Sequence, residues 1–552
     1  MNTFQVTILD AKYDFPIGVS LEEVMARVKP EGYAKIVAAK VDGILRELTF
    51  MPVEDCRVEP VDLRNEDGLR IYIRGLSFIY VMAVRELYDG SRVEIDHSIS
   101  GGLYCRVHWK RPLTQRDVAQ IETRMHEIVA ENMPFERIEY TKEEAVRLFE
   151  ADGQMDKVRL LKYRPYDHFN VYRCSWMSDY FYGYMVPSTG YLDKFALHYY
   201  LPGMVLQHPR RGEPEKKITF FDQRKLADVF WEASRWGEIL QCVNTADLNR
   251  LVEDGQLRNF IFVNEALHEK KIAEIADQIS QRGSSRKLVL IAGPSSSGKT
   301  TFAHRLSVQL QVNGMSPVAI SLDNYYRNRE ELPLGPDGKR NFENIDSIDV
   351  ELFNEHLSRL LQSEEVELPE YDFTTGRRRD HGRILRLGPD QPVVVEGIHG
   401  LNPSLTQGIP PEMTFKIYIS ALTQLNLDDH NRIPTTDTRL VRRLVRDHHF
   451  RGFSAQETLD IWAKVRMGEE KNIFPYQEEA DAMFNSSLVY EFSVLKPFVM
   501  PLLRAVPEED PNAMEVIRLR KFMNYFLPFT DLEAIPNTSI IREFVGGSCF
   551  EE

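Results

Sequence analysis

The feature that most constrains the fold is the stretch at residues 287–306, KLVLIAGPSSSGKTTFAHRL. The apolar run at 288–292 predicts a short buried strand, and small residues break it at Gly293. A helix is predicted from Lys299 onward, with apolar positions that continue to Leu306. The spacing Gly293-x-x-x-x-Gly298-Lys299-Thr300 fits a phosphate-binding P-loop at every position.

The residue types of this loop suit a nucleotide. Small residues let successive backbone N–H groups turn inward around phosphate oxygens, and the new helix directs its positive end at them. Lys299 is expected to reach the β- and γ-phosphates, and the Thr300 hydroxyl to ligate Mg²⁺. The alternative is a chance glycine turn before a helix, which the flanking strand and helix disfavour. The predicted nucleotide-binding residues are Gly293, Ser295, Ser296, Ser297, Gly298, Lys299, Thr300 and Thr301.

The composition limits the remaining function classes. A chain of 552 residues should hold about three or four domains. The net charge of −15 argues against a general polyanion binder. The five scattered cysteines form no CxxC pair, which suits a reducing cytoplasm and offers no thiolate metal site. No secretory leader or long apolar span is evident, so we expect a cytoplasmic protein without a membrane segment.

Beyond the P-loop, predicted strands and helices alternate, which indicates a parallel sheet with helices on both faces. The strands are PVAISL at 317–322, PVVVEG at 392–397 and FKIYISA at 415–421. Ligands of such sheets lie beyond the carboxyl ends of the strands, where Asp323 and Glu396 also fall. Glu396 has the character of a Mg²⁺-holding residue, and Asp323 could accept a proton from an acceptor hydroxyl. The alternative for each is a solvated carboxylate at a strand end.

A predicted helix near residue 440 carries arginines along one side. At roughly 100° per residue, its apolar residues occupy the side opposite the arginines. The arginines in one arc of about 100° are Arg439, Arg442, Arg443 and Arg446. Guanidinium groups bind phosphate in a bidentate manner, so this face suits a triphosphate, although a charged run is often only a solvated face.

Six motifs in this half follow one family order. They are GPSSSGKT, SLDNYYRN, RNFENIDSIDVELF, PEYDFTTGRR, VVVEGIHGL and DTRLVRRLVRDHHFRG. Over roughly residues 286–500 the chain resembles the uridine kinase and phosphoribulokinase group of P-loop kinases. The resemblance implies an α/β kinase fold that uses ATP (or another NTP) and Mg²⁺.

The resemblance also implies roles for individual residues. Asp323 would be the catalytic base, and the arginine helix would be a lid with phosphate-contacting residues Arg443, Arg446 and Arg451. The residues implied around the metal are Thr300, Asp323 and Glu396. Those implied around the acceptor are Tyr326, Phe342, Glu343, Tyr371 and Phe373.

Departures from the family pattern leave the acceptor open. Glu343 stands where uridine kinases usually have aspartate, and Gly376 stands at the position of the histidine that reads the pyrimidine. The next lid arginine of the family is replaced by Phe453. A sugar hydroxyl, most plausibly the 5′-OH of a nucleoside, is the expected acceptor. The alternative is a phosphorylated sugar or another small alcohol, whose phosphate could bind Arg377, Arg378, Arg379 and Arg383.

The N-terminal half shows a second resemblance. Residues 1–64 predict strands, a helix opened by a Ser20–Glu23 capping box and a hairpin at Asp42-Gly43. IVAAKVDGILREL and GLRIYIRG resemble the TGS module, a ubiquitin-like unit, of threonyl-tRNA synthetases. VRELYDGSRVEIDHSISGGLYCRV, LTQRDVAQIETRMHEIV and MVPSTGYLDKFAL resemble their second additional domain, which hydrolyses mischarged tRNA. The residues at the four catalytic positions of that domain are here Leu76, Tyr80, Phe181 and Met185, so the hydrolytic chemistry is absent.

The expected organisation is a TGS-like domain at 1–64, an editing-domain-like region at 65–225, a helical linker at 226–265 and a kinase domain at 266–552 with a helical C-terminal extension. The N-terminal half is expected to pack against the kinase or to build a homo-oligomer. The alternative is an RNA-responsive regulatory ATP-binding protein, but this half has only small basic clusters with which to neutralise phosphates.

Overall fold

The computed structural model describes residues 3–281, 288–332, 340, 342–372, 375–379, 381–388 and 391–550. The chain divides into two compact units. Unit 1 comprises Met1–Gln223 with two short later segments, Cys242–Asp247 and Leu425–Ile433. Unit 2 comprises Arg224–Gln241, Leu248–Gln424 and Pro434–Glu552. The chain therefore passes between the units several times, and no single linker joins them.

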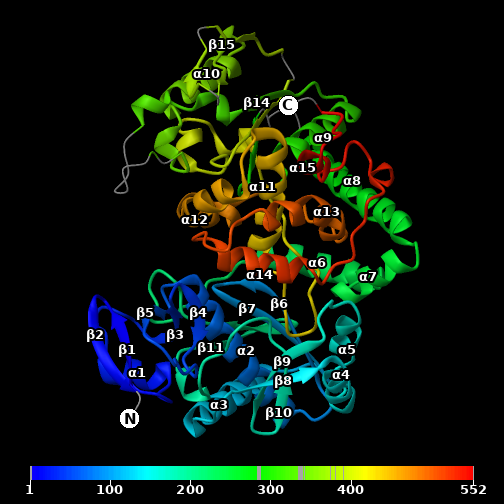
Figure 1. Ribbon diagram of the computed structural model, residues 1–552. Helices are drawn as coiled ribbons and strands as arrows, with labels where there is room; N and C mark the ends of the chain where they lie inside the picture. The colour runs from blue at the N-terminus through cyan, green and yellow to red at the C-terminus, as the bar shows by residue number, and fades with distance from the viewer. Residues whose placement is uncertain are drawn as a thin grey trace. The chain divides into compact units, whose positions relative to one another are not determined.

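Unit 1 begins with a five-stranded sheet of order β2-β1-β5-β3-β4 around one helix (Figure 1). Its elements are β1 (Thr3–Ile8), β2 (Ala11–Pro16), α1 (Leu21–Val28), β3 (Ile36–Val41), β4 (Ile44–Glu47) and β5 (Cys56–Asp62). The predicted capping box is present, because Ser20 and Glu23 each accept from the other's backbone. Asp42 and Gly43 both adopt positive φ in the β3–β4 turn, as a tight hairpin requires.

The rest of unit 1 contains two antiparallel sheets, of orders β11-β12-β7-β6 and β10-β9-β8, packed with helices. The helices are α2 (Glu66–Leu87), α3 (Gln115–Glu131), α4 (Lys142–Ala151) and α5 (Met155–Lys162). The strands are β6 (Arg92–Ile99), β7 (Gly102–His108), β8 (Glu136–Thr141), β9 (His168–Cys174), β10 (Met177–Asp179), β11 (Ala196–Tyr200) and β12 (Gly203–Gln207).

The four positions where the editing chemistry was expected to be absent lie in the interior of unit 1. Leu76, Tyr80, Phe181 and Met185 are all buried, and the Phe181 ring packs against that of Phe78 at 5.9 Å. Across the described part of the chain, no group of three or more His, Cys, Asp or Glu side chains could hold a metal ion. These positions therefore contribute to packing.

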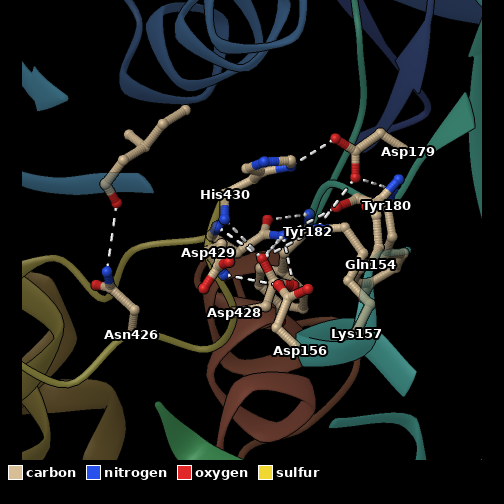
Figure 2. Close-up of polar contacts among 12 residues, drawn as sticks. Gln154, Asp156, Lys157, Asp179, Tyr180, Tyr182, Asn426, Asp428, Asp429 and His430 are labelled. Carbon is tan, nitrogen blue, oxygen red and sulfur yellow. Dashed lines mark hydrogen bonds and ion pairs between the residues drawn. The ribbon is translucent and has the colours of Figure 1, made fainter. Parts of the chain in front are cut away.

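A buried charge network ties the late segment Leu425–Ile433 into unit 1 (Figure 2). The Lys157 ammonium lies 3.1 Å from both the Asp179 and the Asp428 carboxylates, and all three side chains are almost fully buried. The His430 ring contacts Asp179 at 2.7 Å, and Asp428 accepts from the backbone N–H groups of His430 and Asn431. Burial would raise the pKa of Asp179, but Lys157 and His430 outweigh it and lower that pKa to about 2.

Replacing Lys157 by methionine should lower the stability of unit 1 by about 3–5 kcal/mol, because two carboxylates would remain buried without their cation. Thermal unfolding followed by circular dichroism measures the change. Lys12→Met, at an exposed position of β2, is the matched control and should leave the midpoint unchanged. An equal midpoint for both variants would show that the network adds no stability.

Unit 2 is built on a parallel sheet of order β14-β19-β13-β20-β21, which confirms the predicted α/β fold class. Its strands are β13 (Leu288–Ala292), β14 (Val318–Ser321), β19 (Val393–Glu396), β20 (Thr414–Ser420) and β21 (Ala482–Asn485). Leu288 and Leu290 share a core with Phe353 of α10 (Val350–Leu361). Helix α9 (Lys299–Val312) contacts β13, β14 and β19 but is absent from that core, so it covers the other face.

The other described elements of unit 2 are mostly helical. They are α6 (Arg224–Ile239), α8 (Leu257–Gln281), α11 (Thr435–Arg451), α12 (Ala455–Asn472), α13 (Glu491–Arg504), α14 (Ala513–Met523) and α15 (Arg542–Val545). Helix α7 (Thr245–Glu253) begins in unit 1 and ends in unit 2. Short strands form an arm from β15 (Val366–Leu368), β16 (Tyr371–Asp372), β17 (Arg377–Arg378) and β18 (Arg383–Leu385). The expected boundary near residue 265 lies within α8. None of the described helices has the length and apolarity needed to cross a membrane.

Candidate active site

The P-loop has the backbone geometry that an anion site requires. Gly298 has a φ of +83° at the start of α9, and a Cβ at Gly293 would lie 2.0 Å from the carbonyl oxygen of Ile419. The Ser296 and Ser297 hydroxyls are buried and have no hydrogen-bond partner among the described residues. Buried hydroxyls normally find a partner, so these orphaned groups fit a phosphate-bearing ligand.

The strand-end carboxylates lie next to this loop. Ser321 at the end of β14 pairs in register with Glu396 at the end of β19, and its hydroxyl donates to the Glu396 carboxylate at 2.7 Å. Asp323 follows in a short 3₁₀ helix, Leu322–Tyr325. Topology alone therefore brings Asp323 and Glu396 to the edge at which the P-loop begins.

Lys299, Asp323 and Glu396 interact electrostatically, and the pKa of each reflects the charge of at least one of the others. Burial raises the pKa of Asp323, and Lys299 opposes this rise. Burial and the Asp323 charge raise the pKa of Glu396 to about 7, again against Lys299. Burial lowers the pKa of Lys299, while Glu396 and Asp323 favour its protonated form. Two carboxylates and a hydroxyl are hard oxygen ligands, so Asp323, Glu396 and Thr300 fit Mg²⁺ by donor chemistry.

Three of the expected acceptor residues, Tyr326, Phe342 and Tyr371, bring their rings together. The Tyr326 ring lies 5.7 Å from that of Tyr371 and 6.1 Å from that of Phe342. Burial first, and then the Asp323 and Glu343 charges, raises the pKa of Tyr326. Burial raises the pKa of Glu343 to about 7. Phe373 lies outside the described residues.

The structure gives a physical account of Gly376. Its φ is +73°, and a Cβ there would lie 2.7 Å from Nε of Arg329. A side chain at position 376 would therefore need both a strained backbone and a shift of Arg329.

Most of the arginines that could hold an acceptor phosphate already have carboxylate partners. Arg377 pairs with Glu330 and Arg379 with Glu370. Arg378 lies 3.2 Å from Asp349 and donates to the Tyr325 and Tyr326 carbonyls. The pairs of Arg377 and Arg379 are exposed to solvent, whereas that of Arg378 with Asp349 is half-buried.

The arginine helix, α11, directs its cationic face at the P-loop rather than at solvent. Arg443 donates to the Ser295 hydroxyl at 2.8 Å, and Arg439 donates to the Ser295 carbonyl at 3.2 Å. Arg439 and Arg442 are at most 1% exposed and pair with Glu469 and Glu491, respectively. These two arginines also donate to backbone carbonyls of the P-loop, Arg439 to Ser295 and Arg442 to Ser296 at 3.4 Å, whereas Arg443 donates to a side-chain hydroxyl of that loop.

Two further arginines of α11 lie near the expected base. Arg451 and Arg446 both oppose the rise in the pKa of Asp323, which places their charges within electrostatic range of it. Asp447, fully buried, pairs with Arg443 at 3.0 Å and with Arg451 at 3.1 Å. Arg443 and Arg451, two of the three arginines expected at the phosphates, thus share one anchoring carboxylate.

Sequence reasoning missed carboxylates that organise the site from distant segments. Glu469 of α12 accepts from the Ser295 N–H at 3.1 Å and from Arg439. Glu543 of α15 accepts from Thr301, within the P-loop helix, at 3.0 Å. Neither residue belongs to a motif, and only the tertiary structure places them beside the loop.

Comparison with known proteins confirms the kinase resemblance. Residues 288–491 match the model of the Phosphoribulokinase / Uridine kinase family. A solved structure described as a possible uridine kinase from Bacillus stearothermophilus is 22% identical, with a TM-score of 0.27. That alignment covers 39% of this chain and 98% of the other.

The N-terminal region has homologues among threonine–tRNA ligases. The enzyme of Nitratidesulfovibrio vulgaris (strain DSM 19637 / Miyazaki F) is 32% identical over 194 residues, which is 35% of this chain and 30% of that protein. The enzyme of Polaromonas sp. (strain JS666 / ATCC BAA-500) is 29% identical over 43% of this chain and 34% of its own length. The chain thus spans about a third of these relatives.

Proposed function

We propose that unit 2 catalyses ATP- and Mg²⁺-dependent phosphorylation of a sugar hydroxyl, and that this hydroxyl is the 5′-OH of a nucleoside. The observation that carries this proposal is the meeting of Lys299, Asp323 and Glu396 at the strand ends beside a P-loop, with Arg443 donating into that loop. The match of residues 288–491 to a family of kinases supports it.

Each of these residues has a separate proposed role in phosphoryl transfer. Asp323 accepts the proton of the acceptor hydroxyl, and its raised pKa makes it a stronger base than an exposed aspartate. Lys299 and the arginines of α11 stabilise charge on the transferring phosphoryl group. Mg²⁺, held by Thr300, Glu396 and Asp323, would neutralise phosphate charge when bound. Tyr326, Tyr371 and Glu343 orient the acceptor.

A screen of acceptors with an ADP-release assay tests the substrate class. Nucleosides, sugar phosphates and other small alcohols are offered with ATP and Mg²⁺ to the full chain. We expect turnover with a nucleoside, the acceptor that the proposal names. Turnover with a sugar phosphate alone would replace the nucleoside assignment, and the absence of any acceptor-dependent turnover would refute the kinase.

For unit 1 we propose a scaffold without editing activity. The observation that supports this is the burial of Leu76, Tyr80, Phe181 and Met185, none of which offers an imidazole or thiolate. The full chain should release no amino acid from mischarged threonine-acceptor tRNA above the buffer rate. A filter assay of labelled Ser-tRNA, with an editing-competent threonine–tRNA ligase as positive control, checks this. Measurable deacylation would show that another group performs the chemistry.

RNA binding without hydrolysis is the second candidate, favoured by the likeness to tRNA ligases. It would appear as micromolar or tighter binding of bulk tRNA to the full chain at about 0.15 M salt, lost at higher salt.

A further inference from the structure

The C-terminal segment of unit 2, which lies beyond the residues that match the family model, packs directly on the P-loop. Helix α15 lies beside α9 and α11 (Figure 1). The Ile540 side chain is fully buried, and a Cβ at Gly298 would lie 2.5 Å from its Cγ2 atom. Position 298 therefore requires glycine for two reasons. Its backbone adopts a positive φ, and this segment approaches too closely to leave room for a side chain.

Glu543 is the charged residue that this segment brings to the site. Its side chain is 4% exposed. One carboxylate oxygen accepts from the Thr301 hydroxyl at 3.0 Å, and the other accepts from Nη1 of Arg446 at 3.4 Å. A buried carboxylate is costly unless it is paired and hydrogen-bonded. Here both partners belong to elements that the proposed function places around the nucleotide phosphates.

Arg446 has its shortest carboxylate contact with Glu543, whereas Arg443 and Arg451 pair closely with Asp447. Asp447 lies 3.0 Å from Arg443 and 3.1 Å from Arg451, but 3.9 Å from Arg446. The contact of Arg446 with Glu543, at 3.4 Å, is shorter than its contact with Asp447. Arg443 and Arg446 also repel Arg451, as the lowered pKa of Arg451 reflects after the effect of burial. A second carboxylate is therefore needed to hold the Arg446 guanidinium among like charges.

We infer that Glu543 is a positioning residue for phosphoryl transfer, which holds Arg446 and the Thr301 end of the P-loop helix in the arrangement that catalysis requires. The inference rests on the proposed function. It assigns the C-terminal extension a part in the active site, acting through Arg446 rather than by contact with the substrate.

A positioning role predicts a split between turnover and binding. Glu543→Gln keeps the size of the side chain but removes its charge, so the ion pair with Arg446 becomes a hydrogen bond to a neutral amide. We expect kcat to fall about 10-fold, since hydrogen bonds to charged groups are worth that order. The Kd for a fluorescent ATP analogue, mant-ATP, should stay equal or become tighter, because a negative charge beside the triphosphate is lost. If Glu543 only held the fold together, Glu543→Gln would lower kcat and weaken mant-ATP binding together.

The decisive experiment is a double-mutant cycle on the full chain with Glu543→Gln and Arg446→Ala, read by ADP release. If Glu543 acts through Arg446, Glu543→Gln should change kcat less than about twofold in the Arg446→Ala background. Arg446→Lys, which keeps the charge but not the planar fork, should reproduce the loss seen in Glu543→Gln. Glu533→Gln, an exposed carboxylate on the same segment, is the matched control and should behave as the wild type.

Other results overturn the inference. They are wild-type kcat in Glu543→Gln, an equal loss in the Arg446→Ala background, or weaker mant-ATP binding in step with lost turnover. Acceptor-free ATP hydrolysis and mant-ATP titration are measured in parallel. The hydrolysis rate should show the same fall and the same coupling as ADP release, and the Kd for mant-ATP should not rise. Failure of every acceptor would then refute the proposed kinase function, while these two measurements still decide the role of Glu543.

Discussion

Asp323→Asn should lower kcat by about 10²–10⁴-fold while ATP binding is kept, because a general base in phosphoryl transfer is typically worth that much. Asp323 lies at the end of β14, where burial raises its pKa and Lys299, Arg451 and Arg446 oppose that rise. Asparagine has a similar shape and can still accept a hydrogen bond, but it cannot take the proton from an acceptor hydroxyl. Steady-state ADP release with the best acceptor measures the loss.

The matched control for this change is Asp346→Asn, an exposed aspartate of the same unit, which should turn over as the wild type does. Mant-ATP titration separates loss of chemistry from loss of binding. Near-normal turnover in Asp323→Asn would remove Asp323 from the role of base and leave it as a charge beside the metal.

Lys299→Ala should reduce kcat/KM for ATP by at least about 10²-fold, since removing one preorganised donor from a buried transition state costs 10²–10³-fold. Lys299 begins α9, and its positive charge interacts with the charges of both Glu396 and Asp323. Its loss also leaves two buried carboxylates less compensated. Initial rates over a range of ATP concentrations report the effect, with exposed Lys270→Ala as the control.

The companion change Glu396→Gln separates metal handling from nucleotide binding. Ser321 can still donate to the amide oxygen, so the strand end should keep its geometry. The Mg²⁺ concentration that gives half-maximal rate should rise about tenfold or more, because a neutral amide is a poorer ligand for a hard cation than a carboxylate. If Lys299→Ala and Glu396→Gln both kept wild-type ATP affinity and Mg²⁺ dependence, the P-loop assignment would be wrong.

The local features of this protein follow from sequence alone. An apolar run, small residues at fixed spacing and a helix-forming stretch predict β13, the P-loop and α9, because those conformations depend on neighbours within a few residues. The capping box at Ser20 and the hairpin at Asp42-Gly43 are predictable for the same reason. The sequence also predicts that Asp323 and Glu396 lie near each other, because parallel strands bring their carboxyl ends to one edge of a sheet.

Contacts between distant segments could be decided only by the tertiary structure. The sequence shows that α11 carries arginines on one side. It does not show that Arg439 and Arg442 pair with Glu469 and Glu491, or that Arg443 reaches the Ser295 hydroxyl. Periodicity assigns a residue to a face of its helix, whereas the partner of that face depends on which other helices pack there.

Two further contacts could not be predicted from the sequence for the same reason. Lys157 meets Asp428 across 271 positions of the chain, and Glu543 meets Thr301 across 242. Neither pair has a signature in composition or spacing. Burying charge is favourable only when a partner is supplied, and the fold, not the local sequence, supplies it. The sequence determined that this chain carries a phosphate-binding loop, and the tertiary structure decided which charges stand around it.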